Sequence, residues 1–273
     1  MNYRHIYHAG NFADVFKHWI LTLILDRLCV KNTPFCLLDT HAALGFYNLQ
    51  HDNAQKTLEY KSGIARILEH APDPAFKSYV NIVNKYRHDH SAYPGSGAIM
   101  HEYLRDNDRL ILNELHPEDY QALTDNFKSD KRIQIMQQDA YICIKAVLPP
   151  KERRGLILID PPFEQTDEFS KIITGLKDGL KRFATGVYAI WYPIKDRKQI
   201  DKFYRELKDM SLKNAIGIEL HANDSILEQL HSCGMIIINP PWKLQQDLEA
   251  NMPTLIKYLE LSKGSYKLFD FSL

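Results

Sequence analysis

The sequence has few of the features that mark secreted or metal-binding proteins. Its 273 residues include only four cysteines, and no two of these have the spacing of a zinc site or a redox pair. We therefore expect reduced thiols and no bound metal. The first residues lack the pattern of a signal peptide, and the most apolar run, residues 19–25, is far too short to span a membrane. These absences predict a cytoplasmic protein with no membrane segment.

An excess of charge of either sign is also missing. The 34 Lys and Arg residues balance 34 Asp and Glu residues, so the formal net charge is zero. A protein that binds nucleic acid through its total charge would be more basic, so any such contact must depend on a local patch or on some of the twelve histidines. The length suffices for one α/β domain with an insertion, or for two small domains.

Short apolar runs alternate with helical patterns along most of the chain. Apolar residues at helical spacing predict a helix over residues 11–30, with Asn11 as a possible N-cap. Further helices are expected near residues 117–128, 167–182 and 196–208. Strands are expected at residues 35–38, 110–112, 133–136, 155–159, 186–191, 215–220 and 234–238. This alternation predicts an α/β fold with a parallel sheet, in which ligands bind at the carboxyl ends of the strands.

One interval is too long for a regular α/β unit. The acid that ends the second strand usually lies about 20 residues after the first turn, but Glu114 comes much later. The excess predicts two helices, over residues 57–70 and 74–87, and then a turn at Tyr93-Pro94-Gly95. We interpret residues 49–94 as a helical insertion subdomain over the ligand face. Residues 1–48 and 95–273 would then form the main domain.

The tetrapeptide Asp160-Pro161-Pro162-Phe163, directly after the strand at 155–159, is the strongest chemical signal. An exocyclic amine of adenine or cytosine is a poor nucleophile, because its lone pair is delocalised into the ring. A carboxylate and a backbone carbonyl that accept its two hydrogens favour the pyramidal nitrogen that attacks a methyl group. Proline fixes such a loop without a competing N–H, and the next aromatic ring can stack on an unpaired base. The pattern indicates a nucleic-acid amine methyltransferase; the alternative is a rigid turn that ends a strand.

A second run, Asn239-Pro240-Pro241-Trp242, fits the same pattern after the strand at 234–238. Strand order decides between the two, because the fourth strand neighbours the first at the switch point and the seventh lies further out. We therefore assign catalysis to Asp160 and a structural or substrate-side role to Asn239.

The first βα turn contains one glycine, Gly45, whereas a dinucleotide-binding turn requires three. This disfavours NAD and FAD but not S-adenosylmethionine, which has no pyrophosphate. Asp39 and His41 could face its amino-acid end. Glu114 fits the two ribose hydroxyls, and Asp139 fits the adenine amine. The alternatives are a helix cap for Asp39 and solvated carboxylates for the other two acids.

Two further groups of residues are ambiguous. Ser96 is most simply the N-cap of the helix after the Tyr93-Pro94-Gly95 turn, although a helix N-terminus also attracts carboxylates. The first twenty residues mix tyrosine with basic side chains, which can hold an RNA backbone and a stacked base or be structural. These residues are Tyr3, Arg4, His5, His8, Lys17 and His18.

With these motifs in place, the chain resembles the RlmJ family of bacterial 23S rRNA adenine-N6 methyltransferases. The matching runs are Tyr3-Arg4-His5, His8-Ala9-Gly10-Asn11, Ala13-Asp14-Val15, Lys17-His18, Leu38-Asp39-Thr40-His41-Ala42, Tyr93-Pro94-Gly95-Ser96, Glu114-Leu115-His116-Pro117, Arg153-Arg154-Gly155-Leu156-Ile157-Leu158-Ile159-Asp160-Pro161-Pro162, Trp191-Tyr192-Pro193 and Asn239-Pro240-Pro241-Trp242-Lys243. Three positions depart from the family's usual residues: Ala43 and Ala140 replace glycines, and Phe163 replaces tyrosine. The Cβ atoms of the two alanines restrict the backbone conformations of the cofactor loops. Phe163 retains the aromatic ring of tyrosine and lacks only its hydroxyl.

The resemblance implies a Rossmann-like class I S-adenosylmethionine methyltransferase fold with a small inserted helical subdomain. It implies N6-methylation of adenine 2030 of 23S rRNA, before subunit assembly is complete, by a monomer that needs no metal or membrane. The tail residue Tyr3 would touch the rRNA, and His5 and Lys17 would order the N-terminal tail on the substrate side. Asp160, Pro161 and Phe163 would hold the target adenine. S-adenosylmethionine would be bound by His18, His41, Ser96, Glu114, Asp139, Ala140 and Asp160.

Two rival functions stay open from the sequence. A DNA adenine methyltransferase would carry the same tetrapeptide, although the N-terminal run favours RNA. A catalytically silent RNA-binding scaffold of the same fold would have lost either the strand-end acids or the tetrapeptide, and this sequence keeps both.

Overall fold

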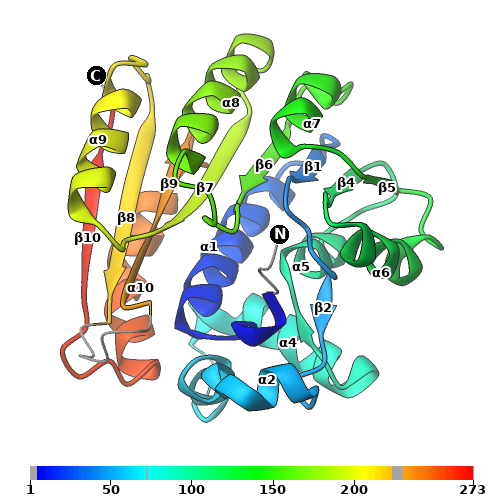
Figure 1. Cartoon of the computed structure of the whole chain (residues 1–273), viewed down its shortest axis with the longest axis vertical. Coiled ribbons are helices and arrows are strands. Elements are labelled where there is room, and N and C mark those ends of the chain that lie inside the picture. Colours follow the sequence, from blue (N-terminus) through cyan, green and yellow to red (C-terminus); the bar gives the residue numbers. More distant parts are fainter. Residues whose placement is uncertain (1–4, 72, 223–229, 273) are drawn as a thin grey trace.

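A mixed eight-stranded sheet forms the centre of the molecule in the computed structural model, which describes residues 5–71, 73–222 and 230–272 (Figure 1). The strand order is β10-β8-β9-β7-β6-β1-β4-β5. In chain order the strands are β1 (Cys36–Asp39), β4 (Arg109–Asn113), β5 (Ile133–Met136), β6 (Gly155–Ile159), β7 (Val187–Pro193), β8 (Ala215–His221), β9 (Ser232–Ile238) and β10 (Ser265–Asp270). The predicted α/β, Rossmann-like fold is confirmed.

The parallel part of the sheet consists of β5, β4, β1, β6 and β7. The prediction of an entirely parallel sheet is wrong beyond β7, because β9 pairs antiparallel with both β7 and β8, and β10 pairs antiparallel with β8. Since β9 runs opposite to β6, the carboxyl end of β9 lies on the side of the sheet where β6 begins. All seven predicted strands are present, and β10 was not predicted.

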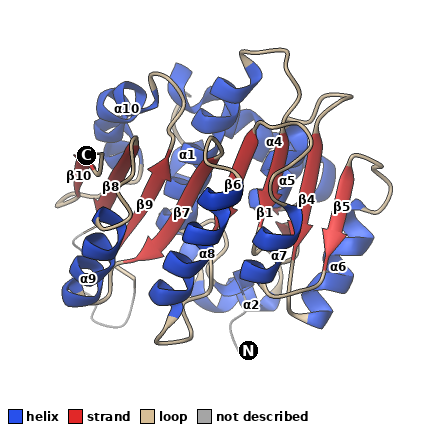
Figure 2. Cartoon of the chain, turned by 90° about the horizontal axis from the view of Figure 1, so that it is seen from above, coloured by secondary structure: helices blue, strands red, loops and turns tan. Residues whose placement is uncertain are grey.

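Helices cover both faces of this sheet (Figure 2). The helices α7 (Ala140–Val147), α8 (Glu168–Arg182) and α9 (Arg197–Lys208) bury one face, whereas α1 (Phe12–Cys29), α5 (Ser96–Glu102) and α10 (Leu244–Tyr258) bury the other. The helix α6 (Pro117–Phe127) packs against β5. The predicted N-cap of the first helix is confirmed, since the Asn11 side chain accepts a hydrogen bond from the backbone N–H of Asp14. Within the described residues, no helix is long and apolar enough to cross a membrane.

The segment at 49–94 is helical but more broken than predicted. The single helix expected over 57–70 is instead two short pieces, η2 (Glu59–Ser62) and α3 (Ile64–Leu68), and a helix that was not predicted, α2 (Asp52–Thr57), precedes them. Leu58 has a left-handed backbone (φ 54°), and a Cβ on Gly63 would lie 2.1 Å from the carbonyl oxygen of Gly10. The break thus lets the segment approach the start of α1 closely. The second predicted helix is η3 (Pro74–Phe76) followed by α4 (Lys77–His90).

The inserted segment shares a core with the main fold. Trp19 of α1 stacks on Phe76 with ring centroids 4.9 Å apart, and buried residues of α4 belong to the same apolar cluster as α1. The ends of the segment are joined by a two-stranded ladder of β2 (Phe46–Tyr47) and β3 (Tyr93–Pro94). In Figure 1 the segment lies below α1, next to the short N-terminal helix η1 (His5–Tyr7). The segment therefore forms part of the wall around the start of α1.

Candidate active site

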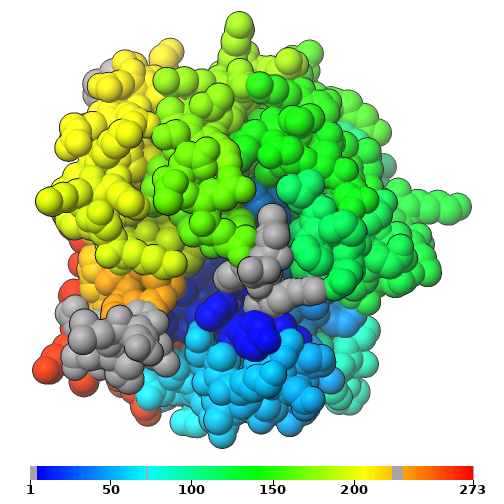
Figure 3. All heavy atoms as spheres, in the orientation of Figure 1, coloured from blue at the N-terminus to red at the C-terminus, as the bar shows by residue number. Residues whose placement is uncertain are grey.

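A cavity of about 760 Å³ lies where β1, β4, β5 and β6 end, with the start of α1 and η2 on its other side. In the space-filling view, the surface is hollowed where the dark-blue N-terminal residues lie between the green residues and the light-blue inserted segment (Figure 3). Tyr3 lies outside the described residues. Of the other residues that the sequence assigned to cofactor or substrate, all but Asp39 line the cavity: His5, Lys17, His18, His41, Ser96, Glu114, Asp139, Ala140, Asp160, Pro161 and Phe163.

The tetrapeptide loop opens into this cavity from the carboxyl end of β6. Because β6 pairs directly with β1, Asp160 lies at the switch point of the sheet, as predicted. Phe163 has a left-handed backbone (φ 51°), which is unusual for a bulky residue and often marks a functional loop. Its ring lies edge-on to Trp191, with centroids 6.1 Å apart. The loop thus presents a carboxylate and an aromatic face to the same space.

Asp160 is held by a buried ion-pair network that begins on α1. The ammonium of Lys17 lies 2.5 Å from Oδ2 of Asp160 and 2.9 Å from Oδ1 of Asp14. Burial by itself would lower the pKa of Lys17, but the two carboxylates raise it, so the side chain stays charged. Asp14 in turn accepts hydrogen bonds from Nε2 of His5 and from the backbone N–H of Gly10, both at 3.0 Å. Although burial would raise the pKa of Asp14, His5 and Lys17 hold it well below its usual value.

The acids that end β4 and β5 also reach the cavity, but neither is simply a solvated carboxylate. The two oxygens of Glu114 accept hydrogen bonds from the backbone N–H groups of Ala43 (2.9 Å) and His116 (2.8 Å), and burial raises its pKa. Asp139 is the N-cap of α7 and accepts from the backbone of Tyr141. Ala43 has a left-handed backbone (φ 46°). Glycine adopts this conformation without steric cost, whereas the Cβ of Ala43 makes it unfavourable.

Two expectations for the first turn and α5 are wrong. Asp39 is not a helix cap and does not line the cavity, because it is fully buried and accepts a hydrogen bond from the backbone N–H of His41. Ser96 is the first residue of α5, and the N-cap is Gly95. Burial raises the pKa of the Asp39 carboxyl to about 6. Asp39 therefore holds the backbone of His41, a residue of the cavity wall, without itself lining the cavity.

The buried Asp39 carboxyl makes a prediction for the dependence of stability on pH. The folded protein binds a proton here at a higher pH than the unfolded chain does, so this group stabilises the fold more as the pH falls through 6. From pH 7.5 to pH 5 its contribution to the free energy of unfolding should rise by about 1 kcal/mol. Urea titrations of the wild type and of Asp39→Asn at both pH values should differ by this amount. Parallel pH profiles would show that Asp39 is ionised in the fold.

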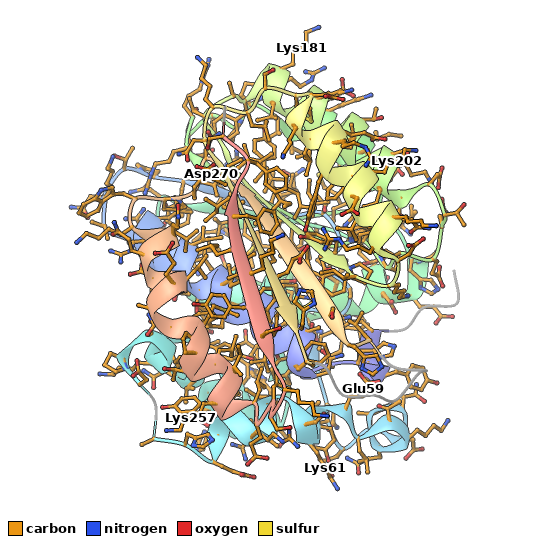
Figure 4. All side chains as sticks on the ribbon, turned by 90° about the vertical axis from the view of Figure 1, so that its left-hand side faces the viewer. Glu59, Lys61, Lys181, Lys202, Lys257 and Asp270 are labelled. Atoms are coloured by element: carbon orange, nitrogen blue, oxygen red, sulfur yellow. The ribbon has the colours of Figure 1, made fainter. Side chains whose placement is uncertain are left out.

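The second tetrapeptide lies at the opposite edge of the sheet. The side-chain amide of Asn239 donates hydrogen bonds to the carbonyls of Ala184 and Gly186, both at 2.8 Å, in the loop between α8 and β7. Lys181, near the end of α8, marks this edge at the top of Figure 4, whereas Glu59 lies beside the start of α1 at the other end of the molecule. The structural role expected for Asn239 is thus accounted for by these bonds.

Comparison with known proteins identifies the family. The family model described as ribosomal RNA large subunit methyltransferase D, RlmJ, matches residues 32–270. The chain is 43% identical over 259 residues to ribosomal RNA large subunit methyltransferase J of Escherichia coli K12, covering 93% of this chain and 92% of the relative. It is 41% identical over 264 residues to the protein of the same name from Haemophilus influenzae, covering 95% and 94%. The chain belongs to the RlmJ family. The expected resemblance is confirmed.

A solved structure has the same fold over nearly the whole chain. A crystal structure of a protein from Legionella pneumophila superposes with a TM-score of 0.88 at 36% identity, and the match covers 96% of this chain and 98% of that one. In this RlmJ-family fold, the described residues contain no group of three or more His, Cys, Asp or Glu side chains arranged to hold a metal ion.

The structure adds residues to the site that sequence reasoning did not assign. Asp14 lies three positions before Lys17 on α1, a helical spacing that could have indicated the pair. Glu59 reaches the cavity from the inserted segment and bonds to His8 and Asn11, at 3.0 and 2.9 Å. Trp191 faces Phe163 from β7. No local pattern in the sequence indicated these last contacts.

Proposed function

We propose that this RlmJ-family chain transfers a methyl group from S-adenosylmethionine to N6 of an adenine in 23S rRNA, at the position corresponding to adenine 2030. The observation that carries the proposal is the Asp160 loop, which opens from the carboxyl end of β6 into a cavity with acids at the ends of the two strands beyond β1. Family membership supports ribosomal RNA as the substrate class. The adenine position comes from the resemblance and is part of the proposal.

The residues of the cavity fit S-adenosylmethionine. Across the sheet the acids follow the order Asp160, Glu114, Asp139 from β6 to β5, so an elongated ligand would meet them in that sequence. Asp139 would accept from its adenine amine and Glu114 from its ribose hydroxyls, with Ala140 and His41 completing the wall. Its methionine end would then lie by β1 and β6, near His18 and Ser96. When bound, this cofactor supplies an electrophilic methyl group.

The loop residues would act on the target adenine. Phe163 would stack on the base, which must be unpaired or flipped to reach the cavity. Asp160 and the Pro161 carbonyl would accept the two N6 hydrogens and hold the nitrogen in line with the methyl group. Lys17 occupies Oδ2 of Asp160 and thereby orients the carboxylate. Positioning and fixed charge of this kind account for much of the acceleration in such sites.

The N-terminal residues would form the substrate side. His5 is tied to Asp14, and through Lys17 this pair is connected to Asp160. Tyr3 would contact the rRNA. We expect the substrate to be rRNA that is not yet fully assembled, because a flipped adenine must be accessible, and the protein to act as a monomer.

Mapping N6-methyladenine in rRNA from cells with and without the gene tests the proposal. We expect loss of a single N6-methyladenine in 23S rRNA when the gene is deleted, with recovery when it is restored. An unchanged map would overturn the assignment. Methyl incorporation by the purified protein into naked 23S rRNA, assembled subunits and duplex DNA would then separate an RNA enzyme from a DNA enzyme. Absence of thermal stabilisation at millimolar S-adenosylmethionine would instead favour a silent scaffold.

A further inference from the structure

A chain of three buried polar groups runs from the inserted segment to the cavity wall. The hydroxyl of Tyr79, on α4, lies 3.0 Å from the hydroxyl of Tyr93, on β3. The Tyr93 hydroxyl lies 2.7 Å from Nδ1 of His18, on α1. All three side chains are buried, and the other ring nitrogen of His18, Nε2, has no hydrogen-bond partner within the described residues. His18 itself lines the cavity, whereas the two tyrosines do not.

The direction of the hydrogen bonds in this chain follows from counting donors. In the part of the chain that the structure describes, the Tyr79 hydroxyl has Tyr93 as its one acceptor, so its hydrogen must point there. Tyr93 then has Nδ1 of His18 as the acceptor for its own hydrogen. The reverse direction would leave the Tyr79 hydroxyl hydrogen without an acceptor at a site remote from the cavity, which is costly, whereas the direction chosen here leaves only the Nε2–H of His18, a residue that lines the cavity. Nδ1 of His18 is therefore the acceptor, and the ring hydrogen must be on Nε2.

We infer that Tyr93 is a positioning residue that fixes His18 as an Nε2–H donor for the carboxylate at the methionine end of S-adenosylmethionine. This inference rests on the proposed function. Burial lowers the pKa of His18 to about 3, so the ring is neutral and carries a single hydrogen. His18 follows Lys17, which contacts Asp160 at the end of β6. Since the adenine and ribose of the cofactor are assigned to β5 and β4, His18 lies at its amino-acid end.

The inference gives the inserted segment a role in the cofactor site. Tyr93 and Tyr79 both belong to residues 49–94, and neither touches the cavity. The effect of Tyr93 on the ligand must therefore pass through His18. If the ring hydrogen of His18 were on Nδ1, Nε2 would present a lone pair instead of an N–H donor to the cofactor carboxylate. The two would repel each other, and cofactor binding would weaken.

The first test is the ring tautomer of His18 in the ligand-free protein. The ¹⁵N shifts of the imidazole nitrogens distinguish Nε2–H from Nδ1–H, and loss of the signals in His18→Gln assigns them. We expect Nε2–H in the wild type and also in Tyr79→Phe, because Tyr93 keeps its acceptor when Tyr79 loses its hydroxyl. A wild-type Nδ1–H tautomer would overturn the inference, since it requires the reverse chain.

The second test is the affinity for S-adenosylmethionine, measured by titration calorimetry. Tyr93→Phe should weaken binding about tenfold, as expected for one lost hydrogen bond to a charged group, whereas the matched Tyr79→Phe should bind as the wild type does. A merely structural effect would weaken both variants alike. In His18→Gln, whose amide supplies a donor near Nε2 independently of Tyr93, adding Tyr93→Phe should cost no further affinity.

The outcomes separate this inference from the function on which it rests. If the wild type does not bind S-adenosylmethionine, the proposed function fails. If the wild type binds but Tyr93→Phe binds equally well, or if the loss persists in the His18→Gln background, the proposed function stands and the role of Tyr93 is refuted.

Discussion

Asp160→Ala is expected to lower methyl transfer by about a thousandfold or more, while S-adenosylmethionine still binds. The substitution removes the acceptor that would hold one N6 hydrogen of the adenine, and it also leaves Lys17 with Asp14 alone. Binding should weaken only modestly, because Glu114, Asp139 and His18 lie elsewhere along the cavity. Single-turnover incorporation of labelled methyl into 23S rRNA, with calorimetric titration of the cofactor, measures both quantities.

Asn239→Ala is the matched control for this experiment. Asn239 begins the other tetrapeptide, but its amide bonds to two backbone carbonyls at the far edge of the sheet. We expect a loss of about 1–2 kcal/mol in the free energy of unfolding and single-turnover rates within twofold of the wild type. If Asn239→Ala abolished transfer while Asp160→Ala retained it, the assignment of the two tetrapeptides would be reversed.

The sequence was sufficient to predict which of these two loops lies at the switch point, because their strands come at different places in the expected strand order. Apolar runs predicted β6 and β9 correctly, and the α/β pattern placed β6 beside β1. The antiparallel direction of β9 was not predictable from its residues. The residues of a fully buried apolar strand do not indicate whether it is parallel or antiparallel to its neighbours, because its direction depends on how it pairs with other strands. The antiparallel direction of β9 supports the assignment of catalysis to Asp160, because it places Asn239 on the side of the sheet opposite to the cavity.

Local patterns were less informative at the periphery. The strand β10 alternates between half-buried and exposed residues at the edge of the sheet, so it has no apolar run to reveal it. The helix expected over 57–70 breaks at Leu58 and Gly63, where the chain must approach Gly10. That requirement comes from tertiary packing, which overrides helix propensity.

The polar network of the site was the part least accessible to sequence reasoning. Lys17 and Asp160 are separated by 143 residues, and their contact depends on α1 lying across the end of β6. Strand-end acids can be predicted from strand patterns, because each follows its own strand. The partner of such an acid can come from any element, and only the fold identifies it.

Lys17→Met is expected to cause the second-largest loss, in both stability and activity. Methionine keeps much of the aliphatic stem but removes the ammonium that lies between the two carboxylates, so Asp160 loses its cation and the buried Asp14 keeps His5 alone. Breaking a buried ion pair in this way typically costs about 3 kcal/mol in the free energy of unfolding. Methyl transfer should fall about a hundredfold, because Asp160 loses the contact that orients its carboxylate. Urea titration and single-turnover assays at a temperature where the variant is folded measure the two effects.

The double variant Asp14→Asn/Lys17→Met separates the stabilising role of Lys17 from its role at Asp160. Asparagine removes the buried charge of Asp14 and can still accept from the backbone N–H of Gly10, so much of the lost stability should return. Activity should stay low, because the contact to Oδ2 of Asp160 is still missing. Recovery of both stability and turnover would mean that Lys17 serves the fold alone. A double variant that regains its stability but not its turnover would show that Lys17 is needed for methyl transfer as well as for folding. The ammonium would then stabilise the fold through Asp14 and orient the catalytic carboxylate through Asp160.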